Sequence, residues 1–273
     1  HIVYGVELCR QVVYDLADAH RVKTVADLLV VHLQEGPQPF GIHGIHGRTL
    51  PIAYGIKASR PDLNVVVVGG GIIGVSTAMF LAQQGVSPVV CEKGQFAGEQ
   101  SSRNWGWVRR MGRDPRELPL IVEALRLWED MDRLVGSDVG FRRTGILYLC
   151  EDDADIAHHE NWLARAGAFA LDSRIIRGDE LAAKLPGAAR NFHAALHTPS
   201  DGRAEPQKAA PAIARAASLA GATLVGNCAV RDIETADGKV TGVVTERGRI
   251  SCSQVVVAGG VWSTKLLRRL GLR

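Results

Sequence analysis

The sequence predicts an α/β protein with a doubly wound, mainly parallel sheet and a second, smaller α+β domain. Three observations support this fold class. Strand-like and helix-like segments alternate along the chain. An uncharged, β-branched run at 65–68 is typical of a buried parallel strand, and a glycine-rich turn and a helical segment follow it. The length of 273 residues favours about two domains at ~150 residues each.

The composition narrows the class of protein further. Hydrophobic residues make up 46% and charged residues 22%, which is typical of a soluble globular chain and excludes disordered and fibrous proteins. Lysine and arginine number 32 and aspartate and glutamate 29, without a basic block, so no nucleic-acid partner is expected. Several of the 30 glycines cluster in one motif, which indicates backbone that approaches a ligand.

Residues 1–63 are predicted to form an N-terminal helical extension of different origin from the rest. Apolar residues recur at helical spacing over 5–34, which predicts two short helices. A loop follows, and then a helix over 51–59 that begins with proline. His43 and His46 lie in the loop, but without a nearby third ligand we expect no metal site.

The next segment is predicted to form a β-α-β unit. The strand at 65–68 leads into a helix over 72–84, and a second strand covers 88–92. Residues 65–82 carry no charge and approach the length of a membrane span. The glycine triplet favours strand, turn and helix instead, so no transmembrane segment is expected.

Beyond this unit a loop at 95–115 precedes a helix over 117–135. Strands then mix with helices, which predicts a smaller substrate domain over 140–198. Its expected strands are 144–150 and 192–198, and its expected helices are 154–166 and 178–185. His193 and His197 lie in the second of these strands, where we expect structural histidines with satisfied hydrogen bonds.

The chain then returns to the first domain, which is predicted to comprise 64–139 and 199–273. A helix is expected at 204–220, followed by strands at 223–225, 229–234, 240–246 and 255–258. The Asp237-Gly238 dipeptide between two of these strands indicates a hairpin.

Three glycines, Gly69, Gly71 and Gly74, follow the first strand in the pattern G-x-G-x-x-G. The first permits a tight turn, the second lets the backbone approach a pyrophosphate, and the third lets helix and strand pack closely. The anion would lie at the helix N-terminus, where free N–H groups and the helix dipole stabilise it. By itself the pattern also fits an ordinary glycine-rich turn.

Glu92 ends the second strand about 20 residues later, where an acid accepts hydrogen bonds from the ribose hydroxyls of an adenosine. Its carboxylate disfavours a 2′-phosphate, so NADP is not expected. Strand, turn, helix and acid in register therefore predict a Rossmann-like, FAD- or NAD-binding domain. Which dinucleotide it binds stays open at this point.

Four stretches in order resemble one known family. They are VVVVGGGIIGVSTAMFLAQQGVSPVVCEKG, GEQSSRNWGWVR, DGRAEPQKAAPAIARAASLAGATLVGNCAVRDI and VVVAGGVWS. Over residues 64–273 the chain is similar to the FAD-dependent D-amino acid oxidase and dehydrogenase superfamily, which includes glycine oxidase and sarcosine oxidase. The resemblance implies FAD as the cofactor. The contacts that it implies are Gly69, Gly70, Gly71, Ile73, Gly74, Glu92, Lys93, Ser101, Ser102, Asn104, Gly106, Val230, Ala258, Gly259 and Trp262.

The resemblance also implies an enzyme that transfers hydride from an amino acid or secondary amine to flavin N5, with oxygen or a quinone as the electron acceptor. Such chemistry needs no protein nucleophile, so the catalytic residues stay unknown. Arg109 is a candidate for binding the substrate carboxylate, because guanidinium pairs bidentately with it, or else a solvated loop residue. Trp105 and Trp107 either cover the flavin or are packing residues.

Members of this family continue beyond the Trp-Ser turn, whereas this chain runs from His1 to Arg273. We therefore expect a truncated form whose second domain is incomplete at the C-terminus. One alternative is a catalytically defective fused fragment that keeps the dinucleotide-binding fold.

A further alternative comes from residues 43–70, which resemble the thiamine-diphosphate subunit of 2-oxoacid:ferredoxin oxidoreductases. In that family an acidic Gly-Asp-Gly-Asp motif follows the strand, whereas Gly-Gly-Gly-Ile stands here. Without these carboxylates the loop offers no ligands for magnesium, so this function is less expected.

Five cysteines are spread along the chain without a Cys-x-x-Cys pair, so neither a zinc site nor a thioredoxin motif is predicted. We expect no bound metal. The sequence also shows no cationic, apolar leader at its start. Both observations favour a cytoplasmic location.

Overall fold

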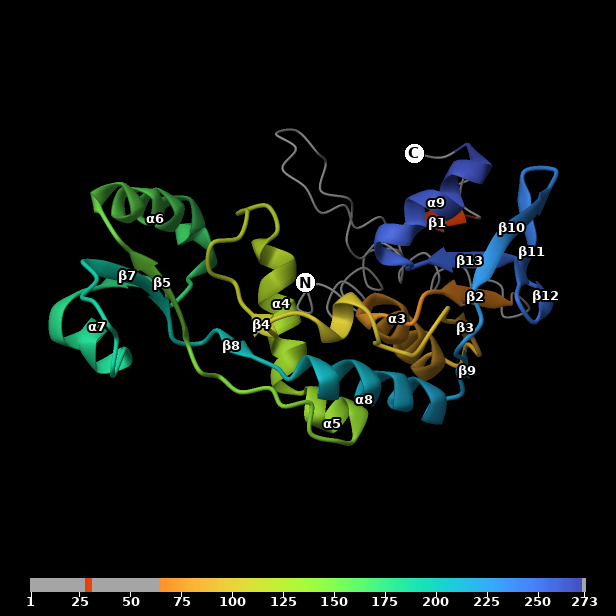
Figure 1. Ribbon diagram of the computed structural model, residues 1–273, viewed down its shortest axis with the longest axis horizontal. Coiled ribbons are helices and arrows are strands. Elements are labelled where there is room, and N and C mark those ends of the chain that lie inside the picture. The colour runs from red at the N-terminus through yellow and green to blue at the C-terminus, as the bar shows by residue number, and fades with distance from the viewer. Residues whose placement is uncertain (1–27, 31–63, 272–273) are drawn as a thin grey trace.

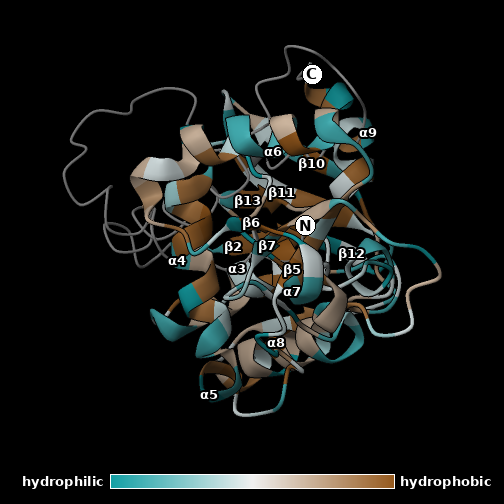
Figure 2. Ribbon diagram, turned by 90° about the vertical axis from the view of Figure 1, so that its left-hand side faces the viewer, coloured by the Kyte–Doolittle hydropathy of each residue, from teal (hydrophilic) through white to brown (hydrophobic). Residues whose placement is uncertain are grey.

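The computed structural model describes residues 28–30 and 64–271. Figure 1 shows an elongated molecule with a parallel sheet at one end and a smaller antiparallel sheet at the other, with helices between them. Hydrophobic residues follow the strands in the interior, and hydrophilic residues gather on the outer turns of the helices (Figure 2). The boundaries of the predicted domains stay a prediction.

Five strands of the described residues form the parallel sheet, in the order β1-β13-β2-β3-β9. Every neighbouring pair runs parallel, which confirms the predicted parallel sheet. The strands are β1 (Leu28–Val30), β13 (Gln254–Val257), β2 (Val65–Val68), β3 (Val89–Cys91) and β9 (Thr223–Val225).

The valines of β2 bury both faces of this sheet because side chains alternate along a strand. Val65 and Val67 join one hydrophobic core, whereas Val66 and Val68 join another. This two-sided burial explains why the strand sequence contains no polar residue.

Helices cover the first face. The chain forms α3 (Ile72–Gln83), which is buried along most of its length and packs against α8 (Pro206–Leu219). The segment 117–135, predicted as one helix, is divided at Asp130 into α4 (Leu118–Glu129) and α5 (Met131–Val135). Trp128 and Met131, which lie on either side of this interruption, are both buried in the core.

An antiparallel sheet covers most of the second face. It contains β10 (Val230–Ala236), β11 (Lys239–Thr245) and β12 (Gly248–Ser251), and the short helix α9 (Ser263–Leu267) lies beside it. The predicted hairpin is confirmed, since Asp237 and Gly238 connect β10 to β11 with positive φ angles of 51° and 72°. Helices therefore cover one face of the parallel sheet, and the predicted strands of this region, together with α9, cover the other.

The end of the molecule opposite the parallel sheet contains the smaller antiparallel sheet, in the order β5-β7-β6. Both predicted strands and both predicted helices of this region are confirmed, and β6 was not predicted. The elements are β5 (Ile146–Cys150), β7 (Ala194–Thr198), β6 (Arg174–Ile176), α6 (Asp153–Ala166) and α7 (Gly178–Lys184). A two-stranded connection, β4 (Trp107–Val108) with β8 (Gly202–Arg203), leads toward the parallel sheet.

The second of the two short helices expected over 5–34 is wrong at Leu28–Val30, which forms β1 at the edge of the parallel sheet. An apolar run of this kind also fits a helical spacing. Here its backbone pairs with the edge of β13, and this pairing makes it a strand. The other elements expected before residue 64, together with His43 and His46, lie outside the described residues.

Candidate cofactor site

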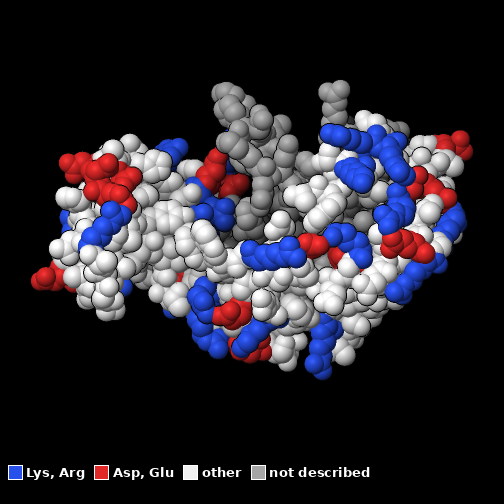
Figure 3. Space-filling model, in the orientation of Figure 1, with Lys and Arg blue, Asp and Glu red and all other residues white. Residues whose placement is uncertain are grey.

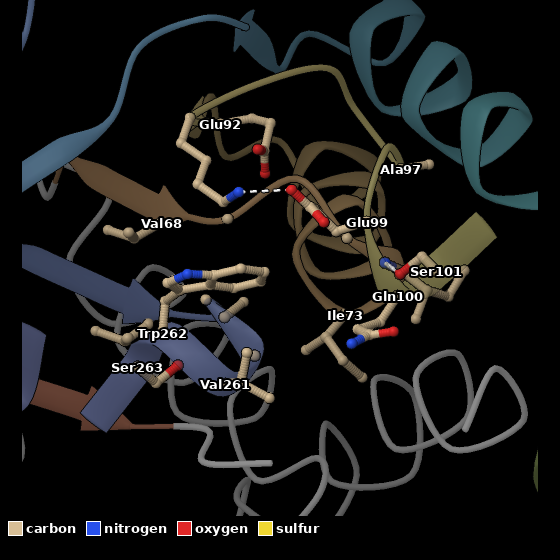
Figure 4. Close-up of a pocket in the computed structure, with 18 of the residues that line it drawn as sticks. Val68, Ile73, Glu92, Ala97, Glu99, Gln100, Ser101, Val261, Trp262 and Ser263 are labelled. Carbon is tan, nitrogen blue, oxygen red and sulfur yellow. Dashed lines mark hydrogen bonds and ion pairs between the residues drawn. The ribbon is translucent and has the colours of Figure 1, made fainter. Parts of the chain in front are cut away.

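A cavity with a volume of about 810 Å³ opens at the carboxyl ends of β2, β3 and β13. Its wall also includes the start of α3, the loop over 97–109, the start of β10 and the turn before α9. In open parallel sheets ligands bind at this edge. Figure 4 shows the Trp262 indole reaching into the cavity between Val68 and Ile73.

The glycine turn at the base of the cavity has no space for side chains. Gly69 has a φ of +108°, and a Cβ there would lie 2.4 Å from the Ala258 carbonyl oxygen. A Cβ at Gly74 would lie 1.8 Å from the Gly69 carbonyl oxygen, so helix and strand approach closely only because both residues are glycine. Gly71 lies on the cavity wall, and a Cβ there would lie 3.0 Å from the Ser101 hydroxyl oxygen.

The N-terminus of α3 faces the same cavity. Ile72 and Ile73 line the wall, and no acidic side chain occupies the first turn of the helix. The Ile72 amide donates to Ser101 Oγ at 2.8 Å. The remaining first-turn amides have no partner within the helix, which leaves a positive helix end for an anion.

Glu92 follows β3 and is only 7% exposed. Its Oε2 accepts the Gly70 amide at 2.7 Å, and its Oε1 accepts the Gly94 amide at 2.8 Å. These two bonds fix the carboxylate on the cavity wall. Each oxygen keeps a second lone pair, so the group can still accept hydrogen bonds from a ligand hydroxyl.

Lys93 and Trp262 approach each other across the cavity. The Lys93 ammonium lies 4.1 Å from the centre of the Trp262 ring and pairs with the Glu99 carboxylate at 2.6 Å. The dashed line in Figure 4 marks this ion pair. The hydrogen bond from Lys93 lowers the pKa of Glu99, and Arg103 adds a second cation at 3.3 Å.

Most of the sequence-predicted contacts meet at this one cavity, although their contact with a cofactor stays a prediction. The wall includes Gly69, Gly71, Ile73, Glu92, Lys93, Ser101, Asn104, Val230, Ala258, Gly259 and Trp262. Four other predicted residues, Gly70, Gly74, Ser102 and Gly106, lie behind it and shape the backbone.

Sequence reasoning missed the cationic side of the cavity. Arg231, Lys265 and Arg269 line the wall near Val230. In Figure 3 basic side chains gather over α9. Arg231 pairs with Glu246, and Arg269 lies 3.6 Å from Asp232. No local motif indicates these residues, because they come together only when β10 and α9 pack side by side.

Arg109 also lines the cavity, and its guanidinium lies against the rings of Trp107 and Tyr148 at 5.8 and 5.4 Å. One of its nitrogens donates to the Met111 carbonyl oxygen. The neighbouring Arg110 points elsewhere and pairs with the fully buried Asp201. Of these two arginines, therefore, Arg109 is better placed to meet a ligand.

Two further expectations concern metals and histidines. Within residues 28–30 and 64–271 no group of three or more His, Cys, Asp or Glu side chains is placed to hold a metal ion. His197 lies in β7 and is buried, and this burial lowers its pKa. Its Nδ1 has no hydrogen-bond partner in the described part of the chain, so the expectation of a satisfied histidine is wrong there.

Four cysteines of the described residues are free and buried, namely Cys91, Cys150, Cys228 and Cys252. Burial, with the neighbouring Cys228, raises the pKa of the Cys91 thiol to about 11. The described helices include none that is long and apolar enough to cross a bilayer.

A parallel sheet with a glycine turn at its carboxyl edge, a helix N-terminus beside it and an acid after the next strand defines the dinucleotide-binding class of α/β proteins. Residues 64–273 match the family described as FAD dependent oxidoreductase (DAO), and the chain belongs to this family. The family resemblance expected from the sequence is thereby confirmed.

Three similar proteins illustrate the match. Sarcosine oxidase subunit beta of Arthrobacter sp is 30% identical over 78% of this chain and 54% of its own length. Mitochondrial sarcosine dehydrogenase of Mus musculus is 26% identical over 77% of this chain and 24% of its own length. The solved structure of L-amino acid deaminase from Proteus myxofaciens, in complex with anthranilate, is 37% identical with a TM-score of 0.73, covering 77% of this chain and 48% of that protein.

The chain thus spans from about a quarter to about half the length of these relatives. By their names these relatives are a sarcosine oxidase subunit, a sarcosine dehydrogenase and an L-amino acid deaminase.

Proposed function

We propose that this chain binds FAD in the cavity and serves the oxidation of an amino acid or a secondary amine. The observation that carries the proposal is the juxtaposition of the Gly69–Gly74 turn, the N-terminus of α3 and the Glu92 carboxylate on one wall. A Cβ at Gly69 would collide with the Ala258 carbonyl oxygen, so glycine there permits the tight turn whose amides would meet a diphosphate.

The residues present fit the parts of an adenine dinucleotide. First-turn amides of α3 and the Gly71 backbone would hold the diphosphate, because both offer N–H groups to an anion. Glu92 would accept from the ribose hydroxyls, and Val230 would lie against the adenine. A volume of about 810 Å³ is within the range of ligand cavities.

A bound flavin supplies the electron acceptor for the substrate C–H bond, and the chain's own residues bind and orient the substrate. Arg109 would pair with the substrate carboxylate, since it lines the cavity and its bond to the Met111 carbonyl oxygen uses one of its guanidinium nitrogens. Oxygen or a quinone would reoxidise the flavin. The free, buried cysteines support a reducing, cytoplasmic location.

The visible spectrum of the purified protein tests this proposal. We expect a flavin spectrum that bleaches on addition of an amino acid or secondary amine without oxygen. Replacement of Gly71 by leucine should remove the flavin, because the new side chain would enter the wall at Ser101. A colourless, folded protein that binds no added FAD would contradict the proposal.

The spectrum, together with a thermal melt, separates the alternatives. A flavin spectrum without bleaching by any amine would favour the catalytically defective fragment. Stabilisation by thiamine diphosphate with magnesium would favour the thiamine-dependent subunit, because a ligand that binds only the folded state raises its melting temperature. Residues 43–63, on which most of that second likeness depends, lie outside the described residues.

A further inference from the structure

Exposed hydrophobic side chains are concentrated on the wall of the cofactor cavity. Among the described residues the exposed large hydrophobic side chains are Trp105, Leu219, Val261 and Trp262, and all except Leu219 line this cavity. Trp105 is 79% exposed. Core packing does not account for an indole in that position, and clustered exposed apolar surface marks binding sites.

Trp105 is the first member of a row of aromatic rings. Its ring centre lies 5.3 Å from that of Trp107, which lies 6.1 Å from Tyr148. Tyr148 in turn lies 5.8 Å from His159. These separations are typical of interacting aromatic pairs. Trp107 therefore packs against Trp105, and Tyr148 packs against Trp107, while most of the Trp105 indole stays exposed at the cavity.

The backbone holds this aromatic wall in place. Gly106, between the two tryptophans, has a φ of +69°, and a Cβ there would lie 2.0 Å from the Ala204 carbonyl oxygen. Asn104 accepts the Gly106 amide at 2.9 Å. Further along the loop, the backbone amides of Arg110 and Met111 donate hydrogen bonds to the buried Asp201 carboxylate. The position of Trp105 is thus set before a ligand arrives.

The charge beside the aromatic wall is positive. Arg103, Arg109 and Arg113 line the cavity with the two tryptophans. The acids on the wall are Glu92, which accepts two backbone amides, and Glu99, which is paired with Lys93 and Arg103. The arginines would therefore attract an anionic group beside Arg109. Both acids on the wall already have hydrogen-bonding or ion-pair partners, which weakens their repulsion of that group.

We propose that the substrate is an amino acid with an aromatic side chain, whose carboxylate pairs with Arg109 and whose ring stacks on Trp105 and Trp107. This inference rests on the proposed function and adds the substrate class to it. A substrate without a side chain, such as glycine, would leave the exposed indole of Trp105 uncovered. A planar ring gains contact area there and an aromatic pairing that a saturated ring of similar size lacks.

Two matched probes test the inference by calorimetry on the purified protein, with and without added FAD. 3-Phenylpropanoate and 3-cyclohexylpropanoate share the carboxylate and differ in the aromatic character of the ring. We expect the phenyl compound to bind about threefold to tenfold tighter, the range that one aromatic pair contributes. Equal affinities of the two probes, or tighter binding of the cyclohexyl compound, would overturn the inference.

Variants assign the preference to particular residues. Trp105→Ala should abolish the preference for the phenyl probe, whereas Trp105→Phe should retain most of it. Arg109→Gln should weaken both probes to a similar extent, because it removes the partner of the carboxylate. Leu219→Ala, which changes an exposed apolar residue outside the cavity, should alter neither. A preference that survives in Trp105→Ala would place the ring elsewhere and overturn the assignment.

The outcomes also distinguish this inference from the proposed function. If the protein holds no FAD but still prefers the phenyl probe through Trp105, the proposed oxidoreductase function fails and the aromatic site stands. If the protein holds FAD but does not distinguish the probes, the substrate class fails and the proposed function stands.

Discussion

Two parts of the cavity wall are built in different ways. The glycine turn with Glu92 is made of backbone atoms and buried bonds, whereas the side with Lys93, Trp105 and Trp262 is made of exposed side chains. A backbone site depends on a few positions that tolerate no other residue. A side-chain site distributes its contacts over groups that water reaches, so single substitutions there should have smaller effects.

The first way to test this difference is Gly74→Ala. The new Cβ would lie 1.8 Å from the Gly69 carbonyl oxygen, so strand and helix must move apart. We expect a loss of about 3 kcal/mol or more in the free energy of unfolding, because a backbone atom cannot yield as a flexible side chain does. Urea denaturation of the purified variant measures the change.

Gly85→Ala is the matched control. Gly85 has a φ of +82°, but a Cβ there would meet no atom within 4 Å. The cost should be only about 1 kcal/mol, from the left-handed backbone alone. Similar losses in the two variants would show that the close approach at Gly74 is not important.

The second test is Glu92→Ala, which removes the acceptor of the Gly70 and Gly94 amides. Leaving these N–H groups without a partner should cost about 2 kcal/mol in the free energy of unfolding. FAD affinity should fall about tenfold or more as the ribose contact is lost. Fluorescence titration with FAD measures the affinity, and Glu92→Gln, which keeps one acceptor oxygen, should lie between. An unchanged affinity in Glu92→Ala would remove this residue from the site.

The third test concerns the side-chain part of the wall. Lys93→Met removes the ion pair with Glu99 and the cation over the Trp262 ring. We expect FAD affinity to fall only about two- to fivefold, because a partly exposed cation contributes little to the binding of an anion. Lys208→Met breaks a similar exposed ion pair, with Asp138, far from the cavity wall and should leave FAD affinity unchanged. A larger effect of Lys93→Met than of Glu92→Ala would reverse the proposed difference between the two parts.

The smallest effect is expected at a surface ion pair. The hydrogen bond from Arg116 lowers the pKa of Asp114 from 3.8 to about 2. An acid whose pKa is lowered by folding stabilises the folded state above its unfolded pKa, and this contribution is lost as the pH falls from 3.8 through 2. Arg116→Met should lower the melting temperature by about 2 °C or less at pH 6, since exposed pairs contribute little.

The pH dependence supplies the check for this pair. Thermal melts of the native protein and of Arg116→Met should converge as the pH approaches 2. A difference that stays constant over this pH range would mean that the pair with Asp114 does not cause it.

The sequence predicted the backbone part of the site because each of its residues lies in one continuous motif. The turn at Gly69, the helix from Ile72 and the acid at Glu92 all follow from local spacing, and the structure has the strands and helix where they were expected. The contact from Ile72 to Ser101 could not be predicted, since 29 residues separate its partners.

The missed elements have physical reasons as well. The strands β6, β8 and β12 are two to four residues long, too short for an alternating pattern to stand out. Leu28–Val30 was predicted as helix because an apolar run fits either period, and only its pairing with β13 decides between them. The aromatic row from Trp105 to Tyr148 depends on how the loop meets β5, which no local signal encodes.

The position of a bound dinucleotide relative to the glycine turn tests the central claim most directly. A crystal structure of the chain with FAD should place diphosphate oxygens within about 2.7–3.2 Å of backbone amides in the Gly69–Gly74 turn, as hydrogen bonds require. It should also place a ribose hydroxyl on Glu92. A dinucleotide bound elsewhere, or a turn that keeps its amides turned away from the diphosphate, would contradict the account.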